Sequence, residues 1–557
     1  MTLLPDRIAS LIREAIQAAQ DAGDLPAFSI PSIPVERPRQ ATFGDFASPV
    51  CLQLAPLARM APLRIAEQVA AHLPPADFVG RVEVARPGYI NLTLDEGWLA
   101  RQVETILAAG DRWGAVDVGR GERIQVEYVS ANPTGPLTVG SGRNAVLGDG
   151  LAGVLEAAGY RVQREYYVND AGSQMQKFAE TLYARYAQAL GHDIPIPEDG
   201  YRGSYMVELG RAIAQEEGER YLRMDRDRAV EALRDEGLRR MLETIREDLA
   251  LLGIHFDRWF SERSLYEDST FETVMQLLRE RGYLEEREGA IWFKATLLGG
   301  DKDEVVVRSN GEPGYFASDI AYHYDKFVRR GFDRVIDVWG ADHQGHVPRM
   351  KAMMKALGLD PDRLIIVIYQ LVTLTREGVE VRLSKRTGEI VTLRELVEEV
   401  GPDAVRFFLL SREANSQMEF DLSLAKQESE KNPVYYVQYA HARIASILRK
   451  AAADGWEATS DRGDVTLLTH PGELALIRKM LELPEVVALS ARQMSPHFLP
   501  HYAQDLAAAF HAFYRDCRVL DPANEALSYA RLKLVRTAKQ VLARTLGLMG
   551  MSAPETM

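Results

Sequence analysis

Apolar residues follow two patterns along this chain, and the pattern changes near residues 115 and 395. Between these positions, continuous apolar runs alternate with stretches of helical periodicity. The runs are RIQVEYVS (123–130), RVIDVWG (334–340) and RLIIVIYQLVTL (363–374). Strands that are buried on both faces have this composition, so the pattern predicts an α/β domain with a largely parallel sheet over 115–395.

The segments on either side of this sheet domain have a different texture. Residues 1–110 mix helical stretches with one extended piece, GYINLTL at 88–94, which predicts a small α+β domain. Within the sheet domain, residues from about 175 to 250 are charged and helical, which predicts a helical insertion. Residues 396–557 carry apolar residues at helical spacing with almost no strand signal, so a helical bundle is expected there.

Composition places the chain among ordinary globular proteins. It has 557 residues, 46% hydrophobic and 26% charged, and no uncharged apolar run of about 18 residues that would predict a membrane span. Arg7, Arg13 and Glu14 interrupt the first helical stretch, which argues against a secretory signal and favours a cytoplasmic location. Cys51 and Cys517 lie at opposite ends of the chain, which excludes a disulfide framework.

A strand–turn–helix corner follows the first apolar run. The strand at 123–130 leads into ANPTGP, and a helix is predicted from about Thr138 to Ala158, with Thr138 able to cap it. A helix N-terminus directs backbone N–H groups at a phosphate, and Gly140 and Gly142 would let a nucleotide approach closely. The alternative is a tight turn whose glycines are needed for packing, because short glycine patterns are weak signals.

Eight segments, in the same order along the chain, resemble the motifs of class I arginyl-tRNA synthetases. They are VEYVSANPTGPLTVGSGRNAVLGD (126–149), REYYVNDAGSQMQ (164–176), YRGSYM (201–206), LGIHFDRWFSERSLY (252–266), YFASDIAYHYDKF (315–327), GADHQGHVPRM (340–350), VRLSKRTG (381–388) and NPVYYVQYAHAR (432–443). The resemblance implies a Rossmann-type catalytic domain, an N-terminal additional tRNA-binding domain and a C-terminal α-helical anticodon-binding bundle. It also implies ATP-dependent attachment of L-arginine to tRNA(Arg) through an arginyl-adenylate, with release of AMP and pyrophosphate.

A binding site for arginine must accommodate a guanidinium that has five donors and no acceptor, so it needs carboxylates and neutral acceptors. Asp319 is expected to pair with the guanidinium, with Tyr315 four positions earlier on the same helical face. A surface ion pair is the alternative role for Asp319. The resemblance implies four further residues of the arginine site: Glu127, Ser130, Asn132 and His343.

The first motif departs from the family pattern at two positions. The family usually has histidines where this chain has Thr138 and Ser141, and hydroxyls can donate to a phosphate oxygen but cannot become cationic. The second motif, VRLSKRTG, has Arg382 and Leu383 where the family has lysine and methionine. The resemblance implies catalytic roles for Thr138, Gly140, Ser141, Ser384 and Lys385, and ATP contacts for Gly140, Gly142, Arg143, Leu383 and Lys385.

The helical C-terminal region resembles an anticodon-binding bundle. Aromatic platforms with polar edges suit unstacked RNA bases, although each aromatic ring could instead belong to the core. The tRNA-binding candidates are Tyr435, Tyr439, His441, Arg443 and Arg536. The helix at 531–544 is basic and has no acidic residue, which is typical either of phosphate contact or of a solvated basic face. The net charge of −14 argues only against non-specific coating of nucleic acid.

The resemblance implies Mg²⁺ carried by ATP, a monomer, and tRNA(Arg), L-arginine and ATP as partners, with no membrane. His323, His343 and His346 lack the further ligands that a zinc site needs, so no protein-bound zinc is expected. A second reading is a catalytically silent synthetase-like protein that binds tRNA or arginine for regulation. The missing motif histidines favour that reading, and the retained motif residues oppose it.

Overall fold

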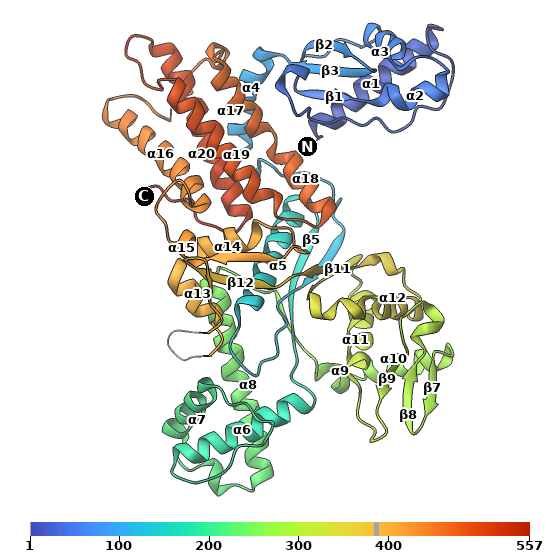
Figure 1. The fold of residues 1–557 in the computed structure, drawn as a ribbon, viewed down its shortest axis with the longest axis vertical. Helices are drawn as coiled ribbons and strands as arrows, with labels where there is room; N and C mark the ends of the chain where they lie inside the picture. The colour runs from blue at the N-terminus through green and yellow to red at the C-terminus, as the bar shows by residue number, and fades with distance from the viewer. Residues whose placement is uncertain (1, 384–388, 460) are drawn as a thin grey trace.

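The computed structural model describes residues 2–383, 389–459 and 461–557 (Figure 1). The parallel sheet occupies the middle of an elongated molecule, the helical bundle and the N-terminal domain lie at one end, and two insertions lie at the other. The predicted fold class is confirmed in all of its parts. No helix within the described ranges is long and apolar enough to span a bilayer.

The N-terminal domain packs three helices on a small antiparallel sheet of order β1-β3-β2. Its elements are α1 (Leu4–Asp21), β1 (Phe46–Ser48), α2 (Val50–Ala58), α3 (Pro62–Ala71), β2 (Val79–Ala85) and β3 (Tyr89–Leu94). The extended piece predicted at 88–94 is the central strand β3. Helix α4 (Glu96–Ala109) then leads toward the bundle.

The central sheet is parallel throughout, with the order β11-β10-β4-β5-β6. Its strands are β4 (Arg123–Glu127), β5 (Arg161–Val168), β6 (Arg258–Ser261), β10 (Arg334–Gly340) and β11 (Leu364–Tyr369). From β4 the chain adds β5 and β6 on one side and later β10 and β11 on the other. The strand order therefore reverses between β4 and β10, and ligands bind at the carboxyl ends of strands at such a point.

The apolar run at 363–374 is two strands rather than one. β11 ends at Tyr369, and β12 (Val372–Arg376) joins a separate sheet with β13 (Val379–Glu380) and β14 (Met418–Asp421). β14 lies beyond residue 396, where almost no strand signal was found. Its four residues are too few for a periodicity to be read, and its parallel pairing with β12 comes from tertiary contact.

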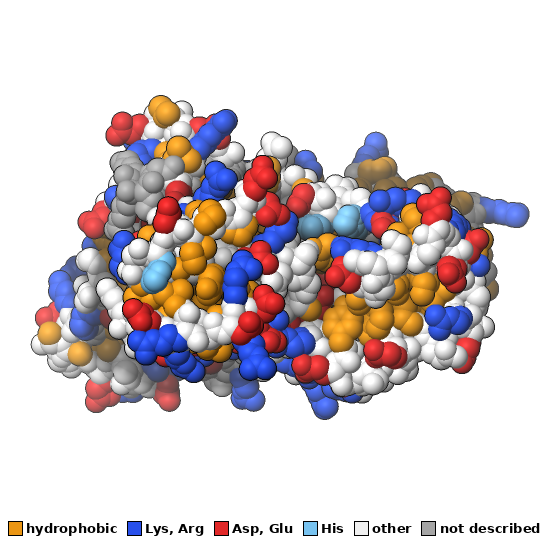
Figure 2. Space-filling view, turned by 90° about the horizontal axis from the view of Figure 1, so that it is seen from below, with side chains coloured by type: hydrophobic (Ala, Val, Ile, Leu, Met, Phe, Trp, Pro, Cys, Tyr) orange, Lys and Arg blue, Asp and Glu red, His pale blue; other side chains and the backbone are white. Residues whose placement is uncertain are grey.

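Two insertions extend from the sheet. The predicted helical insertion consists of α6 (Ser173–Ala189), α7 (Ser204–Glu217) and α8 (Arg226–Leu251), and it has an apolar core of its own. The second contains α9 (Ser264–Glu267), α10 (Thr270–Glu280), β7 (Leu284–Arg287), β8 (Ala290–Phe293), β9 (Glu304–Val307) and α11 (Tyr315–Tyr324), and α12 (Val347–Ala356) packs beside it. Seen from below, apolar side chains gather in two patches with charged side chains between them (Figure 2).

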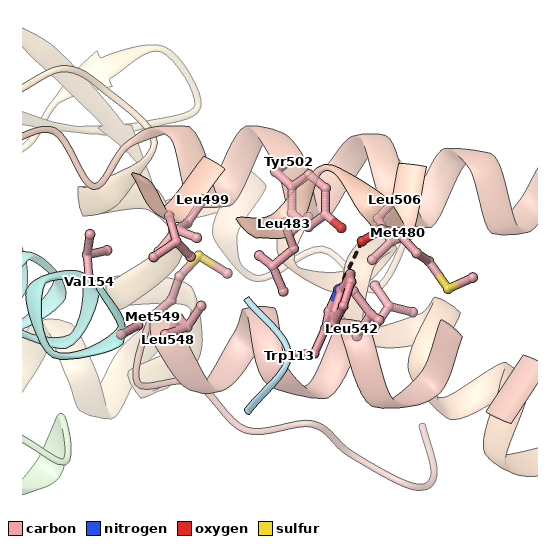
Figure 3. Packing of buried hydrophobic residues seen from close by; sticks show 14 of the residues in the cluster. Trp113, Val154, Met480, Leu483, Leu499, Tyr502, Leu506, Leu542, Leu548 and Met549 are labelled. Carbon is pink, nitrogen blue, oxygen red and sulfur yellow. Dashed lines mark hydrogen bonds between the residues drawn. The ribbon is translucent and has the colours of Figure 1, made fainter. Parts of the chain in front are cut away.

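The bundle follows the central sheet. It contains α16 (Pro433–Ala453), α17 (Pro471–Leu481), α18 (Leu483–Gln493), α19 (Phe498–Asp516) and α20 (Glu525–Leu548). Helix α5 (Val139–Ala157) packs against α13 (Leu393–Val400) and α14 (Pro402–Leu410), α14 also contacts α16, and α15 (Leu422–Ala425) contacts β12. The segment after α4 inserts Trp113 among the bundle helices, and the indole N–H donates to the carbonyl of Met480 at 3.1 Å (Figure 3). The bidentate pair Arg37–Glu485 also ties the N-terminal domain to the bundle.

Candidate active site

Helix α5 begins at the carboxyl end of β4, as the sequence predicts. Thr138 is its N-cap, and the Thr138 hydroxyl accepts from the backbone N–H of Ser141 at 3.4 Å, which confirms the predicted capping role. The Thr138 and Ser141 hydroxyls lie 3.4 Å apart. Two hydroxyls and the first N–H groups of a helix are therefore gathered at the point where the parallel sheet favours an anionic ligand.

The two glycines of this corner differ. A Cβ at Gly140 would meet nothing closer than the Thr138 hydroxyl at 3.7 Å, so the backbone there stays open to a ligand. A Cβ at Gly142 would come within 2.7 Å of the Leu393 side chain. Gly142 is buried and lets α13 pack against α5, so the packing role applies to it and the expected ATP contact is not supported.

Arg143 also has a structural role. Its side chain is fully buried, and its guanidinium donates to the carbonyls of Gln370 at 2.6 Å, Glu413 at 3.1 Å and Ser416 at 2.9 Å. Burial lowers the pKa of Arg143 to about 10. The guanidinium of Arg143 thus links α5 to the residues between β11 and β12 and to those before β14. Because its donors are used there, the structure does not support the expected contact with ATP.

Four carboxylates whose charges influence one another form an acidic cluster: Glu127 at the end of β4, Asp337 in β10, Glu262 after the edge strand β6, and Asp319 on α11. Glu127 ends β4 and accepts from the Ser130 hydroxyl at 3.1 Å and from Lys326 at 2.5 Å. Burial raises the pKa of Glu127, against the opposing effect of Lys326.

Asp319 has no cationic partner among the described residues, a property that it shares with Glu262 of the acidic cluster. It lies half-buried on α11, and no lysine or arginine within residues 2–383, 389–459 and 461–557 forms an ion pair with its carboxylate. Burial raises its pKa to about 6, and Glu127 and Asp337 add to this rise. Because ionisation of this carboxyl is unfavourable without a nearby cation, a half-buried carboxylate of this kind is suited to a cationic ligand.

Sequence reasoning missed Glu262. It lies directly after β6, is buried, and has a pKa raised to about 7 by burial, with Asp319 and Asp170 adding to the shift. The signal was present in the motif LGIHFDRWFSERSLY, since an acidic residue directly after a strand of a parallel sheet lies at the ligand-binding edge.

The other expected ligand residues lie at the rim. Tyr315 begins α11 and is 62% exposed. Asn132 is exposed, donates to Gln174 at 2.8 Å and accepts from Asn169 at 2.7 Å. His343 lies on the short helix Ala341–His346, exposed and 3.3 Å from Asp342.

The second motif is only partly described. Leu383 is 55% exposed and forms an antiparallel bridge with Ile390. Ser384 and Lys385 lie outside the described residues. Across the described part of the chain, no three His, Cys, Asp or Glu side chains are placed to hold a metal ion.

The bundle offers one aromatic surface. Tyr435 and Tyr439 on α16 stack with ring centroids 5.9 Å apart, and the exposed Arg443 donates to the Tyr439 hydroxyl at 3.1 Å. His441 is different, since it is buried and its Nδ1 lies 2.8 Å from the carbonyl of Pro554. It fixes the C-terminal segment, so its expected contact with tRNA is not supported.

The basic face of α20 is largely used inside the molecule. Arg531 pairs with Glu473 at 2.6 Å, Lys533 with Glu104 at 2.9 Å, and Lys539 with Glu555 at 2.6 Å. Arg536 is half-buried among them. Neither alternative weighed for this helix, phosphate contact or a solvated face, describes the three paired residues.

Comparisons with known proteins identify the family. Residues 102–440 match the model described as "tRNA synthetases class I (R), catalytic domain", residues 6–94 match "Arginyl tRNA synthetase N terminal domain", and residues 437–557 match "DALR anticodon binding domain". The chain belongs to the arginyl-tRNA synthetase family. Its catalytic, N-terminal and anticodon-binding models together span nearly the whole chain.

Two curated relatives and one solved structure extend this result. The chain is 52% identical to an arginine–tRNA ligase of Dehalococcoides mccartyi over 99% of its own length and 98% of the relative's. It is 49% identical to an arginine–tRNA ligase of Heliobacterium modesticaldum with the same coverage, 99% and 98%. The Thermus thermophilus arginyl-tRNA synthetase structure superposes with a TM-score of 0.76 at 25% identity, covering 100% of both chains.

Proposed function

We propose that this chain, as a monomer, attaches L-arginine to tRNA(Arg) at the expense of Mg²⁺-bound ATP. Its membership of the arginyl-tRNA synthetase family and its full-length similarity to arginine–tRNA ligases support this activity. The observation that carries the assignment of the site is Asp319, a half-buried carboxylate without a cationic partner among the described residues. A guanidinium supplies the missing charge in a planar, multidentate form.

The reaction runs in two steps. An oxygen of the arginine carboxylate attacks the α-phosphorus of ATP, the bond to the β-phosphate oxygen breaks, and pyrophosphate leaves. The terminal ribose hydroxyl of the tRNA then attacks the carbonyl carbon of arginyl-adenylate, and AMP leaves. Neither step needs a covalent enzyme intermediate, so the protein contributes position and charge stabilisation.

The site residues divide these tasks. Asp319 and Glu262 hold the guanidinium end, with Tyr315 at the rim, while Glu127, Ser130 and Asn132 hold the amino-acid end. His343 lies just after the carboxyl end of β10, on the short helix Ala341–His346. The N-terminus of α5, open at Gly140, receives the α-phosphate together with the hydroxyls of Thr138 and Ser141. Lys385 and Ser384 stabilise the departing pyrophosphate together with Mg²⁺, and Leu383 flanks them.

A catalytically silent tRNA-binding or arginine-binding protein is the alternative. The exchange of two motif histidines for Thr138 and Ser141 is its only support. The capped, open helix N-terminus argues against it, because a silent arginine-binding protein has no use for a site that receives the α-phosphate of ATP.

Charging of tRNA(Arg) with labelled arginine in the presence of Mg²⁺ and ATP decides between the two. The enzyme forms arginyl-tRNA in proportion to its concentration. Intact tRNA binding with no labelled product at high enzyme concentration would leave only the silent reading.

Lys385→Ala is expected to nearly abolish charging, whereas Ser141→Ala lowers it by less. The family motif assigns Lys385 the cation that stabilises the pyrophosphate end, and removing one preorganised donor of this kind typically costs about 10²–10³ in rate. Ser141 shares its task with Thr138 and the helix N-terminus. Single-turnover charging rates of both variants check this division, which is wrong if neither rate changes or if Ser141→Ala is the more damaging.

Tyr439→Ala is expected to raise the KM for tRNA about tenfold and to leave the KM for arginine unchanged. A base stacked on an aromatic ring is worth about 1–3 kcal/mol. Tyr439→Phe keeps the ring and loses only the bond from Arg443, so it serves as the matched control and stays close to the wild type. Equal losses in the Ala and Phe variants would assign the effect to the hydroxyl instead of the ring.

A further inference from the structure

Lys326 is a fully buried lysine beneath the proposed arginine site. Its side chain has no exposed surface, and its ammonium donates to Glu127 at 2.5 Å and to Asp337 at 2.9 Å. The same nitrogen lies 4.1 Å from the centre of the Tyr322 ring. A buried ammonium is costly unless it is paired, and here both of its carboxylate partners belong to the acidic cluster.

The local backbone explains how Lys326 reaches this position. Helix α11 continues directly into one turn of π-helix, Asp325–Arg329, and Lys326 lies in that turn. Asp319, His323 and Lys326 are spaced four and three residues apart, so they share the helix face that is turned to β4 and β10. A single π-turn of this kind is frequent at functional sites.

The carboxylates around Lys326 differ in whether protein groups pair with them. Asp337 is paired inside the protein: it is buried, accepts from Lys326, and lies 2.9 Å from Nε2 of His323. Burial opposes ionisation of Asp337, but Lys326 and His323 outweigh it and lower its pKa to about 2. Asp319 differs, because no lysine or arginine in the described ranges forms an ion pair with it. Lys326 thus neutralises Asp337, which the ligand does not reach, and also pairs with Glu127.

We propose that Lys326 is a positioning residue that acts as the fixed internal cation of the arginine site, holding Glu127 in place and leaving Asp319 as the carboxylate that the substrate must neutralise. This inference rests on the proposed function, since it takes Glu127 and Asp319 as ligands of arginine. It predicts that Lys326 acts on arginine recognition through charge, without contact with the substrate.

The environment of Asp319 fixes the sign of the expected effect. The titratable groups that influence it are His323 on the same helix α11, Lys326 on the π-turn, Glu127 on β4, Asp337 on β10, Tyr167 on β5, Glu262 directly after β6 and Tyr266 on α9. Asp319 must be ionised to pair with a guanidinium, so kcat/KM for arginine falls as the pH drops through its pKa of about 6. Removing a nearby cation raises that pKa, and removing a nearby anion lowers it.

Three variants separate charge from packing: Lys326→Met, Asp337→Asn and the double variant. Lys326→Met is expected to move the acid limb of kcat/KM for arginine at least one pH unit higher and to raise the KM for arginine about tenfold at pH 7, with the KM for ATP within twofold of wild type. Asp337→Asn alone moves the limb to lower pH. The double variant, in which the charge balance is restored, brings the limb back toward the wild-type position.

A purely structural role gives a different pattern. Loss of packing lowers the melting temperature and kcat in the single and double variants alike, and leaves the acid limb where it is in the wild type. An unshifted limb in Lys326→Met, or a limb that the double variant does not restore, overturns the inference. If Lys326→Met does not fold, the test passes to Asp337→Asn, where an unshifted limb has the same meaning.

The outcome is separable from that of the proposed function. A wild-type protein that does not charge tRNA(Arg) refutes the function itself. An Asp319→Asn variant that keeps full arginine affinity refutes the assignment of the site. Loss of arginine use in Asp319→Asn together with an unmoved limb in Lys326→Met refutes only the role of Lys326.

Discussion

Asp319→Asn is expected to lower kcat/KM for arginine by about 10³-fold. Truncating one partner of a desolvated charge pair costs about 2–5 kcal/mol, and a factor of 10³ corresponds to about 4 kcal/mol. The loss is expected mainly in the KM for arginine, because Asp319 binds the end of the substrate remote from the reacting carboxylate. Steady-state charging at varied arginine, with saturating ATP and tRNA, measures it.

Two further readouts make this prediction specific. The KM for ATP stays unchanged, and the part of the acid limb that Asp319 contributes near pH 6 is lost, while the Glu262 carboxyl still titrates. Stability is retained or increased, because a half-buried carboxylate with a raised pKa is a liability to the protein without its ligand. Glu312→Gln, a change at an exposed carboxylate just before α11, is the matched control and is expected to stay near wild-type activity. A similar kcat/KM for Asp319→Asn and the control would remove Asp319 from the site.

Arg143→Met is expected to destabilise the protein by roughly 3–5 kcal/mol, the range seen when one partner of a buried polar network is removed. Methionine fills much of the volume but leaves the carbonyls of Gln370, Glu413 and Ser416 without their donor. Those carbonyls join α5 to the break between β11 and β12 and to the segment that precedes β14. The urea midpoint of the catalytic domain, followed by circular dichroism, measures the change.

The same variant tests the two roles considered for Arg143. A structural role predicts a lower urea midpoint, whereas an ATP ligand predicts a higher KM for ATP with normal stability. Arg223→Met is the control, since Arg223 is 78% exposed and pairs only with Glu219 on the surface. Its expected cost is below about 1 kcal/mol. A normal midpoint with a raised KM for ATP would restore the phosphate role to Arg143.

The sequence by itself determined the features that depend on local pattern. Continuous apolar runs are required by strands covered on both faces, so β10 was predicted at its observed bounds and β4 from its observed start, with an end three residues too far along the chain. The capping role of Thr138 followed from a hydroxyl placed just before a helix that would otherwise leave an N–H group without an acceptor. Asp319 was predicted from the family resemblance and from the need of a guanidinium for a carboxylate, and its role stays a prediction.

The tertiary structure alone decided which residues these elements use to hold one another. The sequence does not reveal whether the side chain of Arg143 or of His441 faces a ligand or the interior, because the residue type is the same in both cases. Their partners, such as Glu413, which lies 270 positions from Arg143, have no local signature in the sequence. The same holds for Gly142 against Leu393 and for Lys326 between Glu127 and Asp337. The physical reason is that the periodicity of apolar residues depends only on which face of a segment is exposed to solvent. The free-energy cost of burying a charge depends instead on the partner that the fold places beside it, which can be distant in the sequence.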